Sequence, residues 1–261
     1  MTPVTMTAAD LPTTWVIDLD GVVWLGKDSI PGSAEAIARL QAEGHTVVFA
    51  SNNSSYTRAA LEAKLNEHGI ASLGHAVTSS QAASHLLHAG EQVLVVGEAG
   101  VSEAVQEAGA EIRDDGPVDT VIVGITPRFD YAMLRRAARA LHGGARLIAT
   151  NTDATLPGPD GLDPGNGSLV AAIATAGGKE PAAIAGKPHR PMADLILARY
   201  GPTGVMVGDR ADTDGEFART LGYDFALVLS GVVTEADLPV EPAPRWLAAD
   251  LARLLPPPAA S

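Results

Sequence analysis

Short apolar runs that alternate with helical stretches are the feature that most constrains the fold of this chain. Thr46–Ala50 is a β-type run that lies between two stretches with helical spacing, Ser33–Glu43 and Thr57–His68. The same order recurs further along, where Val93–Val96 precedes the helical stretch Val101–Ala108. Strands that alternate with helices form βαβ units, and these units build a parallel sheet covered by helices. The pattern therefore predicts an α/β fold.

The same reading predicts the remaining elements. Further strands are expected at 15–17, 118–125, 146–149, 204–207 and 225–229, and further helices at 131–142, 168–176, 192–200, 214–221 and 245–255. Ser33 is expected to cap the first helix. The stretch from Asn151 to Asn166 is rich in proline and glycine, and an irregular segment of that length is more often functional than idle. The proline-rich tail Leu254–Ser261 is expected to be a disordered end.

Composition excludes several classes of function. The net charge is −13 and Lys and Arg do not cluster, which argues against a nucleic-acid partner. There is no cysteine, so thiolate metal sites and cysteine nucleophiles are excluded. The apolar runs are too short to span a bilayer, and no signal peptide precedes Trp15, so a cytoplasmic location is expected and no membrane partner.

Polar side chains follow several of the predicted strands directly. The four clusters are Asp18 and Asp20 after 15–17, Ser51, Asn52 and Asn53 after 46–50, Asp209 after 204–207, and Lys187 after the short apolar run 182–185. Ligands of open parallel sheets bind outside the carboxyl ends of the strands. If these strands are neighbours, the four clusters converge on one crevice.

Asp18 and Asp20 lie two residues apart, so an extended chain directs both carboxylates to the same side. Two close carboxylates repel each other unless a cation or a shared proton intervenes. A magnesium ion (Mg²⁺) suits such a site, and Asp209 can supply a further carboxylate. The alternative is that both acids cap a turn before Gly21. In the same way, the acids from Asp209 to Asp214 can form a solvated turn in which Thr213 or Asp212 caps the next helix, an alternative that fits Asp212 better than Asp209, which ends an apolar strand.

An anion can bind at the loop that follows Thr46–Ala50. Loop N–H groups and the Ser51 hydroxyl make an anion site, although Ser51, Asn52 and Asn53 can equally cap the helix ahead of Thr57. A single lysine is usually a solvated charge. Lys187 stands between a glycine and a proline, which favours a fixed charge of the kind used on phosphates.

Taken in order, these motifs resemble those of the haloacid-dehalogenase-like (HAD) phosphatases. The matching segments are Asp18-Leu19-Asp20-Gly21-Val22-Val23-Trp24, Ser51-Asn52-Asn53, Gly186-Lys187-Pro188 and Gly208-Asp209 through Asp214. The resemblance is closest to the NagD-like branch, which includes phosphoglycolate, pyridoxal phosphate and 4-nitrophenyl phosphate phosphatases. It extends over most of the chain, from Trp15 to Val233, and includes the stretch Ala149-Thr150-Asn151-Thr152-Asp153.

The resemblance implies a Rossmann-like parallel-sheet core, 1–78 and 180–261, with an inserted α/β cap domain at 79–179. It also implies a set of roles. Asp18 would be the nucleophile and Asp20 the acid and base. The Mg²⁺ ligands would be Asp18, the Asp20 carbonyl and Asp209, and the phosphate would be held by Ser51, Asn52, Asn53 and Lys187. Asp214 would orient Lys187 or a metal-bound water, and the leaving group would be contacted or shaped by Asn151 and Asp153.

The implied activity is hydrolysis of a small phosphorylated metabolite such as phosphoglycolate, glycerol phosphate, a sugar phosphate or a nucleotide. A phosphotransferase or mutase on the same fold, and a catalytically silent phosphate-binding protein, remain open alternatives. A dehalogenase is disfavoured because the acid at Asp20 suits an oxygen leaving group, and a receiver-type signalling module is disfavoured by length. A nucleotide-binding oxidoreductase lacks its glycine motif, since Gly97-Glu98-Ala99-Gly100 does not match. A homodimer formed through the cap is a further expectation.

Overall fold

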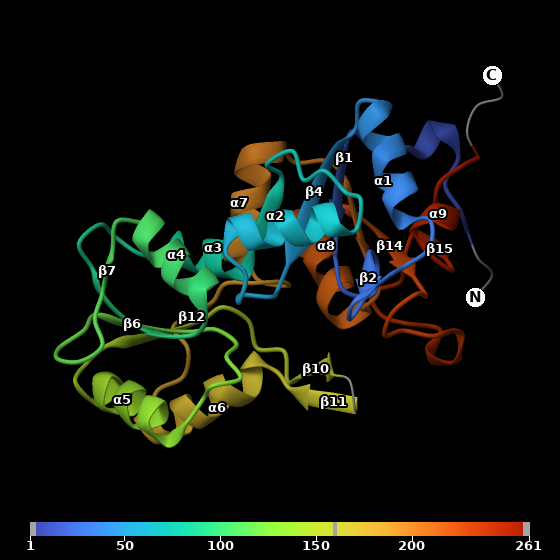
Figure 1. Cartoon of the computed structure of the whole chain (residues 1–261). Helices are drawn as coiled ribbons and strands as arrows, with labels where there is room; N and C mark the ends of the chain where they lie inside the picture. Colours follow the sequence, from blue (N-terminus) through green and yellow to red (C-terminus); the bar gives the residue numbers. More distant parts are fainter. Residues whose placement is uncertain (1–3, 159–160, 258–261) are drawn as a thin grey trace. The chain divides into compact units, whose positions relative to one another are not determined.

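A computed structural model describes residues 4–158 and 161–257 and divides the chain into two compact units. The first, called the core unit, comprises Met1–Ser51, Glu62–Val77 and Ala193–Ser261. The second, called the cap unit, comprises Asn52–Leu61 and Thr78–Met192. Each unit contains its own parallel sheet. The α/β class and the presence of a second sheet agree with the sequence prediction (Figure 1).

The helices and strands have the following bounds. The α-helices are α1 (Ser33–Ala42), α2 (Arg58–Glu67), α3 (Ser79–Ser84), α4 (Ala99–Glu107), α5 (Tyr131–His142), α6 (Asn166–Gly177), α7 (Arg190–Tyr200), α8 (Glu216–Leu221) and α9 (Leu251–Leu254). The strands are β1 (Thr14–Ile17), β2 (Trp24–Leu25), β3 (Asp28–Ser29), β4 (Thr46–Ser51), β5 (Ala76–Thr78), β6 (Gln92–Val96), β7 (Glu111–Ile112), β8 (Thr120–Val123), β9 (Arg146–Ala149), β10 (Thr155–Gly158), β11 (Gly161–Pro164), β12 (Ala183–Ile184), β13 (Val205–Gly208), β14 (Asp224–Val228) and β15 (Trp246–Ala248). Short turns are η1 (Ala8–Asp10), η2 (Ala211–Gly215) and η3 (Glu235–Asp237).

The core unit is built on a six-stranded sheet with the order β15-β14-β13-β1-β4-β5. Strand β1 is buried throughout and pairs in parallel with β13 on one side and β4 on the other. In this register Ile17 lies beside both Val207 and Phe49. The carboxyl ends of these three strands therefore meet at one edge of the sheet, and the polar residues after them are brought to that edge.

The cap unit is built on a five-stranded sheet with the order β12-β9-β8-β6-β7, in which all pairs are parallel. Figure 1 shows α3 and α4 on one face of this sheet and α5 and α6 on the other. Helices α5 and α6 pack on the sheet through small and branched apolar side chains such as Ala137, Leu141 and Ile173. The cap unit therefore has an apolar core of its own.

The structure corrects three sequence predictions of helices and loops outside the candidate site. The helix expected at 245–255 is instead β15 followed by α9, because Trp246–Ala248 pairs with β14 and is buried. The stretch from Asn151 to Asn166 contains the antiparallel hairpin of β10 and β11. Ser33 does not cap α1, since its hydroxyl donates to the carbonyl of Val22.

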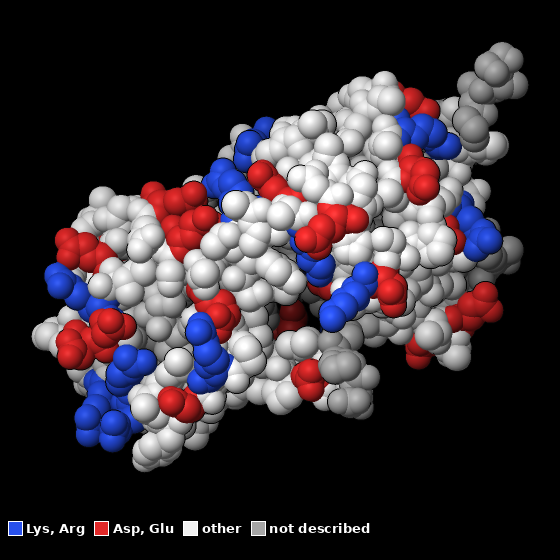
Figure 2. Space-filling view, viewed as in Figure 1, with Lys and Arg blue, Asp and Glu red and all other residues white. Residues whose placement is uncertain are grey.

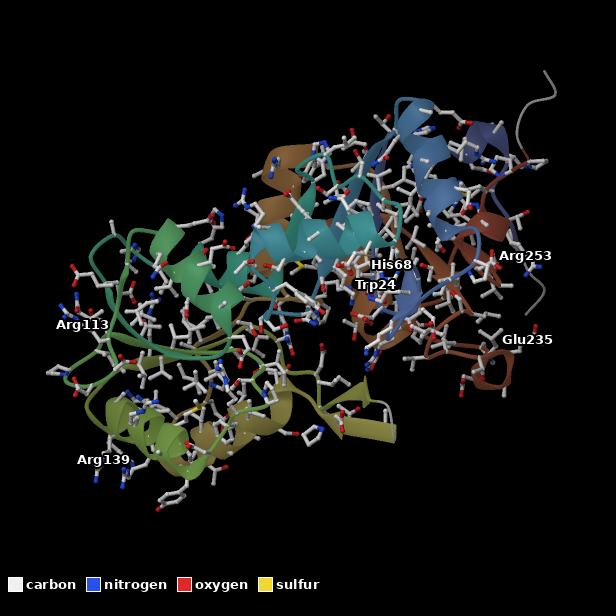
Figure 3. All side chains as sticks on the ribbon, viewed as in Figure 1. Trp24, His68, Arg113, Arg139, Glu235 and Arg253 are labelled. Carbon is white, nitrogen blue, oxygen red and sulfur yellow. The ribbon has the colours of Figure 1, made fainter. Side chains whose placement is uncertain are left out.

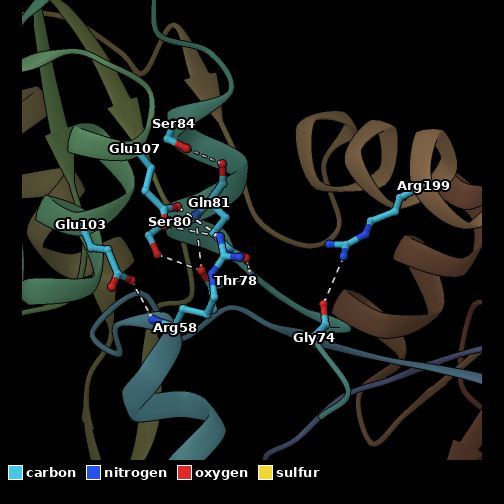
Figure 4. A network of polar contacts seen from close by, with 9 residues as sticks. All are labelled: Arg58, Gly74, Thr78, Ser80, Gln81, Ser84, Glu103, Glu107 and Arg199. Carbon is cyan, nitrogen blue, oxygen red and sulfur yellow. Dashed lines mark hydrogen bonds and ion pairs between the residues drawn. The ribbon is translucent and has the colours of Figure 1, made fainter.

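Several short elements were not predicted, and one of them carries a readable signal. Helix α3 begins with a capping box in which the Gln81 N–H donates to the Thr78 hydroxyl at 3.3 Å and the Thr78 N–H donates to Gln81 Oε1 at 3.0 Å (Figure 4). A Thr followed three residues later by Gln is a known signal for a helix start. At the other end of the chain, Leu254 and Leu255 are buried, so the disorder predicted from Leu254 onward is wrong at these two residues, and 258–261 lie outside the described residues.

The visible surface carries both signs of charge. Figure 2 shows Lys and Arg interspersed with Asp and Glu, with a small basic group over α5. That helix exposes Arg135, Arg136 and Arg139, so three basic side chains do gather here, contrary to the expectation from the sequence that Lys and Arg do not cluster. Within the described part of the chain, no helix is both long enough and apolar enough to cross a bilayer.

A charged group in the cap unit gives a stability prediction. Glu91, whose side chain is 8% exposed, accepts hydrogen bonds from the Thr120 hydroxyl, the His88 N–H at 2.9 Å and Arg146 at 2.9 Å. Burial would raise the pKa of Glu91, but these hydrogen bonds outweigh it and hold the pKa below its ordinary value. A lowered pKa means that the ionised group stabilises the fold above the unfolded pKa, about 4.3, and loses this contribution as the pH falls through the folded pKa.

We therefore expect Glu91→Gln to lower the free energy of unfolding at pH 7 by about 1–2 kcal/mol. The difference from the wild type should shrink as the pH falls below about 4. Urea unfolding followed by circular dichroism measures both effects. Glu111→Gln is the matched control, because its ion pair with Arg113 is exposed and should contribute less than about 0.5 kcal/mol. Equal losses in the two variants would contradict the assignment.

Candidate active site

Three carboxylates gather at the carboxyl edge of the core sheet. Asp18, Asp209 and Asp214 each offer an oxygen, and these oxygens lie within 4.8 Å of one another. Asp209 and Asp214 are buried, and Asp18 is half-buried. Three negative groups at this spacing repel one another unless a cation lies between them. Carboxylate oxygens are the ligands that hard divalent cations prefer, so the group fits a divalent metal site.

Asp18 is positioned by the sheet itself. Its N–H donates to the carbonyl of Val207 at 2.9 Å, which continues the β1–β13 ladder one residue past the end of β1. The strand that precedes it is fully buried, so the position of the Asp18 backbone is fixed by the core of the unit.

Asp209 follows β13 and is enclosed by backbone. Its Oδ2 accepts a hydrogen bond from the N–H of Val232 at 2.7 Å. Gly21 lies against it with a φ of +84°, and a Cβ at that position would lie 2.3 Å from Asp209 Oδ2. Both the left-handed conformation and the close approach require glycine here. The Asp-x-Asp-Gly motif therefore supplies an acid and also the space for Asp209.

Asp214 reaches the group through an unusual turn. The N–H groups of Asp214 and Gly215 both donate to the carbonyl of Arg210, at 2.8 and 3.2 Å, and η2 is a π-helical turn. Such turns are rare and are often found at functional sites. A Cβ at Gly208 would lie 2.2 Å from the Asp214 carboxylate, so glycine leaves room for this side chain. The sequence predicts a regular helix from Asp214, and the resemblance implies that its side chain orients Lys187 or a metal-bound water, whereas the structure places the carboxylate beside Asp18 and Asp209.

Asp20 does not belong to this group of carboxylates. Its side chain is exposed, and its Oδ1 accepts a hydrogen bond from the indole N–H of Trp24 at 2.9 Å. That the backbone carbonyl of Asp20 binds the metal stays a prediction.

Ser51 ends β4 and is buried, and in the parallel register β4 lies directly beside β1.

Lys187 does not follow a strand of the core sheet. The short run before it forms β12, which pairs with β9 of the cap sheet. The four polar clusters were expected to converge if the strands before them are neighbours. The strands β1, β4 and β13 are neighbours in one sheet, but β12 belongs to the other sheet. Two apolar residues carry no information about which sheet they join, since that choice depends on long-range packing.

Within the cap unit, Lys187 belongs to a polar cluster centred on Asn52. Asn52 Oδ1 accepts from the Lys187 N–H at 2.8 Å, and Asn52 Nδ2 donates to the Lys187 carbonyl and to Asp153 Oδ2, both at 3.1 Å. Asn151 Nδ2 donates to the Asn52 carbonyl at 2.7 Å, and its Oδ1 accepts from the Asp153 N–H at 3.1 Å. The structure thus brings together Asn52, Asn151, Asp153 and Lys187, which the sequence named separately.

Asn53 and Thr57 stabilise the backbone between β4 and α2. Asn53 Oδ1 accepts from the Ser55 N–H at 2.9 Å and from its hydroxyl at 2.6 Å, which forms a tight local turn. Thr57 caps α2, since its hydroxyl accepts from the Ala60 N–H at 3.1 Å; the alternative cap at 51–53 is therefore wrong. The start of α2 is anchored on α4, where the Arg58 N–H donates to Glu103 at 2.7 Å and its guanidinium pairs with Glu107 (Figure 4).

Two residues near the polar cluster were missed by sequence reasoning. Asn166 is buried, and its Nδ2 faces the Asn151 carbonyl at 2.8 Å and the Thr150 hydroxyl at 3.2 Å, so it supports the loop that carries Asn151. Burial lowers the pKa of His189, and the negative charge of Asp153 opposes this effect. His189 lies two residues after Lys187, and this proximity in the sequence could have identified it as a neighbour of the polar cluster.

Comparison with known proteins identifies the family. Residues 15–111 match the family model described as haloacid dehalogenase-like hydrolase, and 184–254 match one described as HAD-hydrolase-like. The D-glycerol 3-phosphate phosphatase of Mycobacterium tuberculosis is 37% identical over 83% of this chain, and the match spans 63% of that relative's length. The acid sugar phosphatase of Staphylococcus haemolyticus is 34% identical over 86% of this chain and 88% of its own length.

Solved structures agree with this relationship. The p-nitrophenyl phosphatase from Archaeoglobus fulgidus superposes with a TM-score of 0.87 at 28% identity and covers 94% of this chain and 98% of its own. The glycerol phosphate phosphatase from M. tuberculosis in complex with magnesium has a TM-score of 0.87 at 34% identity, with coverage of 96% and 78%. A putative NagD protein has a TM-score of 0.80 at 29% identity, with coverage of 91% and 94%. This chain therefore belongs to the haloacid dehalogenase-like hydrolases and is a phosphatase of their NagD and p-nitrophenyl phosphatase branch.

Proposed function

We propose that this chain is a magnesium-dependent enzyme that hydrolyses small phosphate monoesters through an aspartyl phosphate formed on Asp18. The observation that carries the proposal is the group of three carboxylates, Asp18, Asp209 and Asp214, at the carboxyl edge of the core sheet. Glycerol phosphate and sugar phosphates are the first substrates to test, because the named relatives are phosphatases of these two classes.

The residues present fit a magnesium ion. Asp18, Asp209 and Asp214 supply hard oxygen ligands, and we propose the backbone carbonyl of Asp20 as a further one. One solved relative is in complex with magnesium and also, in a second structure, with calcium. When bound, the ion neutralises charge, so that a carboxylate and a phosphate can approach each other.

The chemistry then falls to two aspartates. An Asp18 carboxylate oxygen attacks phosphorus, and the bond from phosphorus to the leaving-group oxygen breaks while Asp20 gives that oxygen a proton. In the second step Asp20 takes a proton from water, the water oxygen bonds to phosphorus, and the bond to Asp18 breaks to release phosphate. Acid–base assistance of this kind contributes about 10²–10⁴-fold to the rate.

The groups proposed to bind the phosphoryl group are Ser51, Asn52, Asn53 and Lys187, and Asn151 and Asp153 are proposed to contact the leaving group. The hydrogen bonds that join Asn52, Asn151, Asp153 and Lys187 support a common task for these four residues. The boundaries of the inserted cap at 79–179, a homodimer through that cap and a cytoplasmic location stay predictions.

The test is phosphate release from a panel of esters, with and without Mg²⁺. The panel contains glycerol 3-phosphate, a hexose phosphate, phosphoglycolate, a nucleoside monophosphate and 4-nitrophenyl phosphate. We expect release that requires the ion and that does not depend on an added sugar acceptor. Release only when an acceptor is present would favour the phosphotransferase alternative. A folded protein that releases phosphate from none of these esters would contradict the proposed function.

A further inference from the structure

The loop between β1 and β2 folds Trp24 back onto Asp20. The Gly21 N–H donates to the Trp24 carbonyl at 2.8 Å, and the Val23 and Trp24 N–H groups both donate to the Leu19 carbonyl, at 2.8 and 3.2 Å. Asp20 and Trp24 thereby form an isolated bridge. The indole N–H of Trp24 then donates to Asp20 Oδ1 at 2.9 Å. This contact joins an exposed carboxylate to a side chain that is only 1% exposed.

The Trp24 ring is held from several directions within the core unit. Its ring stacks on His68 with centroids 4.8 Å apart and an interplanar angle of 27°, and Figure 3 shows the two side chains next to each other. The Lys64 ammonium lies 4.1 Å from the ring centroid. The Ser29 hydroxyl bonds His68 Nδ1 at 2.6 Å, and Ser29 pairs with Trp24 across the β2–β3 hairpin.

We infer that Trp24 is a positioning residue that fixes the Asp20 carboxylate for proton transfer, an inference that rests on the proposed function. An exposed aspartate otherwise rotates freely about its side-chain bonds and spends little time in one orientation. Because the Trp24 N–H donates to Oδ1 of Asp20, Oδ1 is the carbonyl oxygen when the Asp20 carboxyl group is protonated. The proton is thereby assigned to Oδ2, which is the atom that gives it to the leaving-group oxygen and later takes one from water.

If Trp24 positions Asp20 for proton transfer, the effect of replacing Trp24 on kcat/KM depends on the leaving group of the ester; if Trp24 only stabilises the fold, it does not. An alkoxide must be protonated as it leaves, whereas 4-nitrophenolate is stable enough to leave without that help. The ratio kcat/KM reports events up to the first chemical step, so the comparison of two esters isolates the proton delivered by Asp20. A loss of packing alone would lower kcat/KM for both esters by the same factor.

The matched variants are Trp24→Phe and Trp15→Phe. Each keeps an aromatic ring and removes one indole N–H, because Trp15 is also buried and donates to the Pro12 carbonyl at 3.0 Å. We expect Trp24→Phe to lower kcat/KM for glycerol 3-phosphate by about 10- to 100-fold and for 4-nitrophenyl phosphate by less than about threefold. Trp15→Phe should leave the ratio between the two esters unchanged.

Asp20→Asn separates failure of this inference from failure of the proposed function. If Asp20→Asn discriminates between the esters and Trp24→Phe does not, the inference about Trp24 is wrong while the proposed function stands. If the wild type releases phosphate from no ester of the panel, the proposed function is wrong; if it is active and Asp20→Asn does not discriminate between the esters, the proposed role of Asp20 is wrong. The inference falls in either case. In the double variant that combines Asp20→Asn with Trp24→Phe, the ratio of kcat/KM between the two esters should equal that of Asp20→Asn alone.

A second measurement uses the wild-type fold in case Trp24→Phe is unstable. The chain has three tryptophans, so three indole N–H signals are expected in a nitrogen-15 correlation spectrum. Asp20→Asn should shift the Trp24 signal and leave those of Trp15 and Trp246 in place. A Trp24 signal that does not respond to Asp20→Asn would overturn the contact on which the inference depends.

Discussion

Asp18→Asn should lower kcat for every ester that the wild type hydrolyses by at least about 10⁴-fold, which is the order found when a nucleophile is removed. The amide has nearly the same shape as the carboxylate and can keep the backbone ladder at this position, but its oxygen is far too weak a nucleophile to form the phosphoryl intermediate. Phosphate release at saturating substrate and magnesium measures the loss.

Asp212→Asn is the control for this variant. It makes the same chemical change on a side chain that is 71% exposed and pairs with Arg210, and it should retain activity within a fewfold of the wild type. Thermal unfolding should show that both variants are folded. If Asp18→Asn kept activity comparable with that of Asp212→Asn, Asp18 would not be the nucleophile.

Asp209→Asn should produce two opposite effects on stability. Without a divalent ion it removes one of three close negative charges, so the melting temperature should rise. The N–H of Val232 can still donate to the amide oxygen, which limits other losses. In the wild type, magnesium at 100 times its Kd should stabilise the fold by about 2.7 kcal/mol, and the variant should lose most of this gain.

Activity should follow metal affinity in the same variant. We expect kcat/KM at subsaturating magnesium to fall by at least about 10²-fold, with partial recovery as the magnesium concentration is raised. Chelation should inactivate the wild type reversibly. Calorimetry of magnesium binding supplies the independent check, and unchanged affinity in Asp209→Asn would place the ion elsewhere.

The residues that the sequence located well are those whose position depends on local signals. Asp18 and Asp209 each follow a short apolar run, and a buried strand that ends in a polar residue is recognisable without knowledge of its neighbours. The general rule that ligands bind at the carboxyl edge of a parallel sheet predicted that these acids converge if their strands are neighbours, and the structure shows that β13, β1 and β4 are neighbours. The fold class and the acids of the core sheet were predictable on this basis.

The features that were missed depend on non-local packing. The π-helical turn that brings Asp214 to Asp18 needs the space left by Gly208, and no periodicity in the sequence reports that space. Residues 246–248 were expected within a helix at 245–255, yet they form β15 because they pair in parallel with β14. Lys187 was expected after a core strand, but β12 pairs with β9 instead. In each case the choice of partner overrides the local pattern.

The most direct test of the account is the stereochemical course at phosphorus. A phosphorothioate analogue of the substrate ester, made chiral at phosphorus with one oxygen-18 atom, is hydrolysed in water enriched in oxygen-17, and the configuration of the released thiophosphate is determined. Attack by Asp18 followed by attack of water comprises two in-line displacements, so the account predicts net retention of configuration. Inversion would mean that water attacks the ester in a single step, and it would contradict an aspartyl-phosphate intermediate.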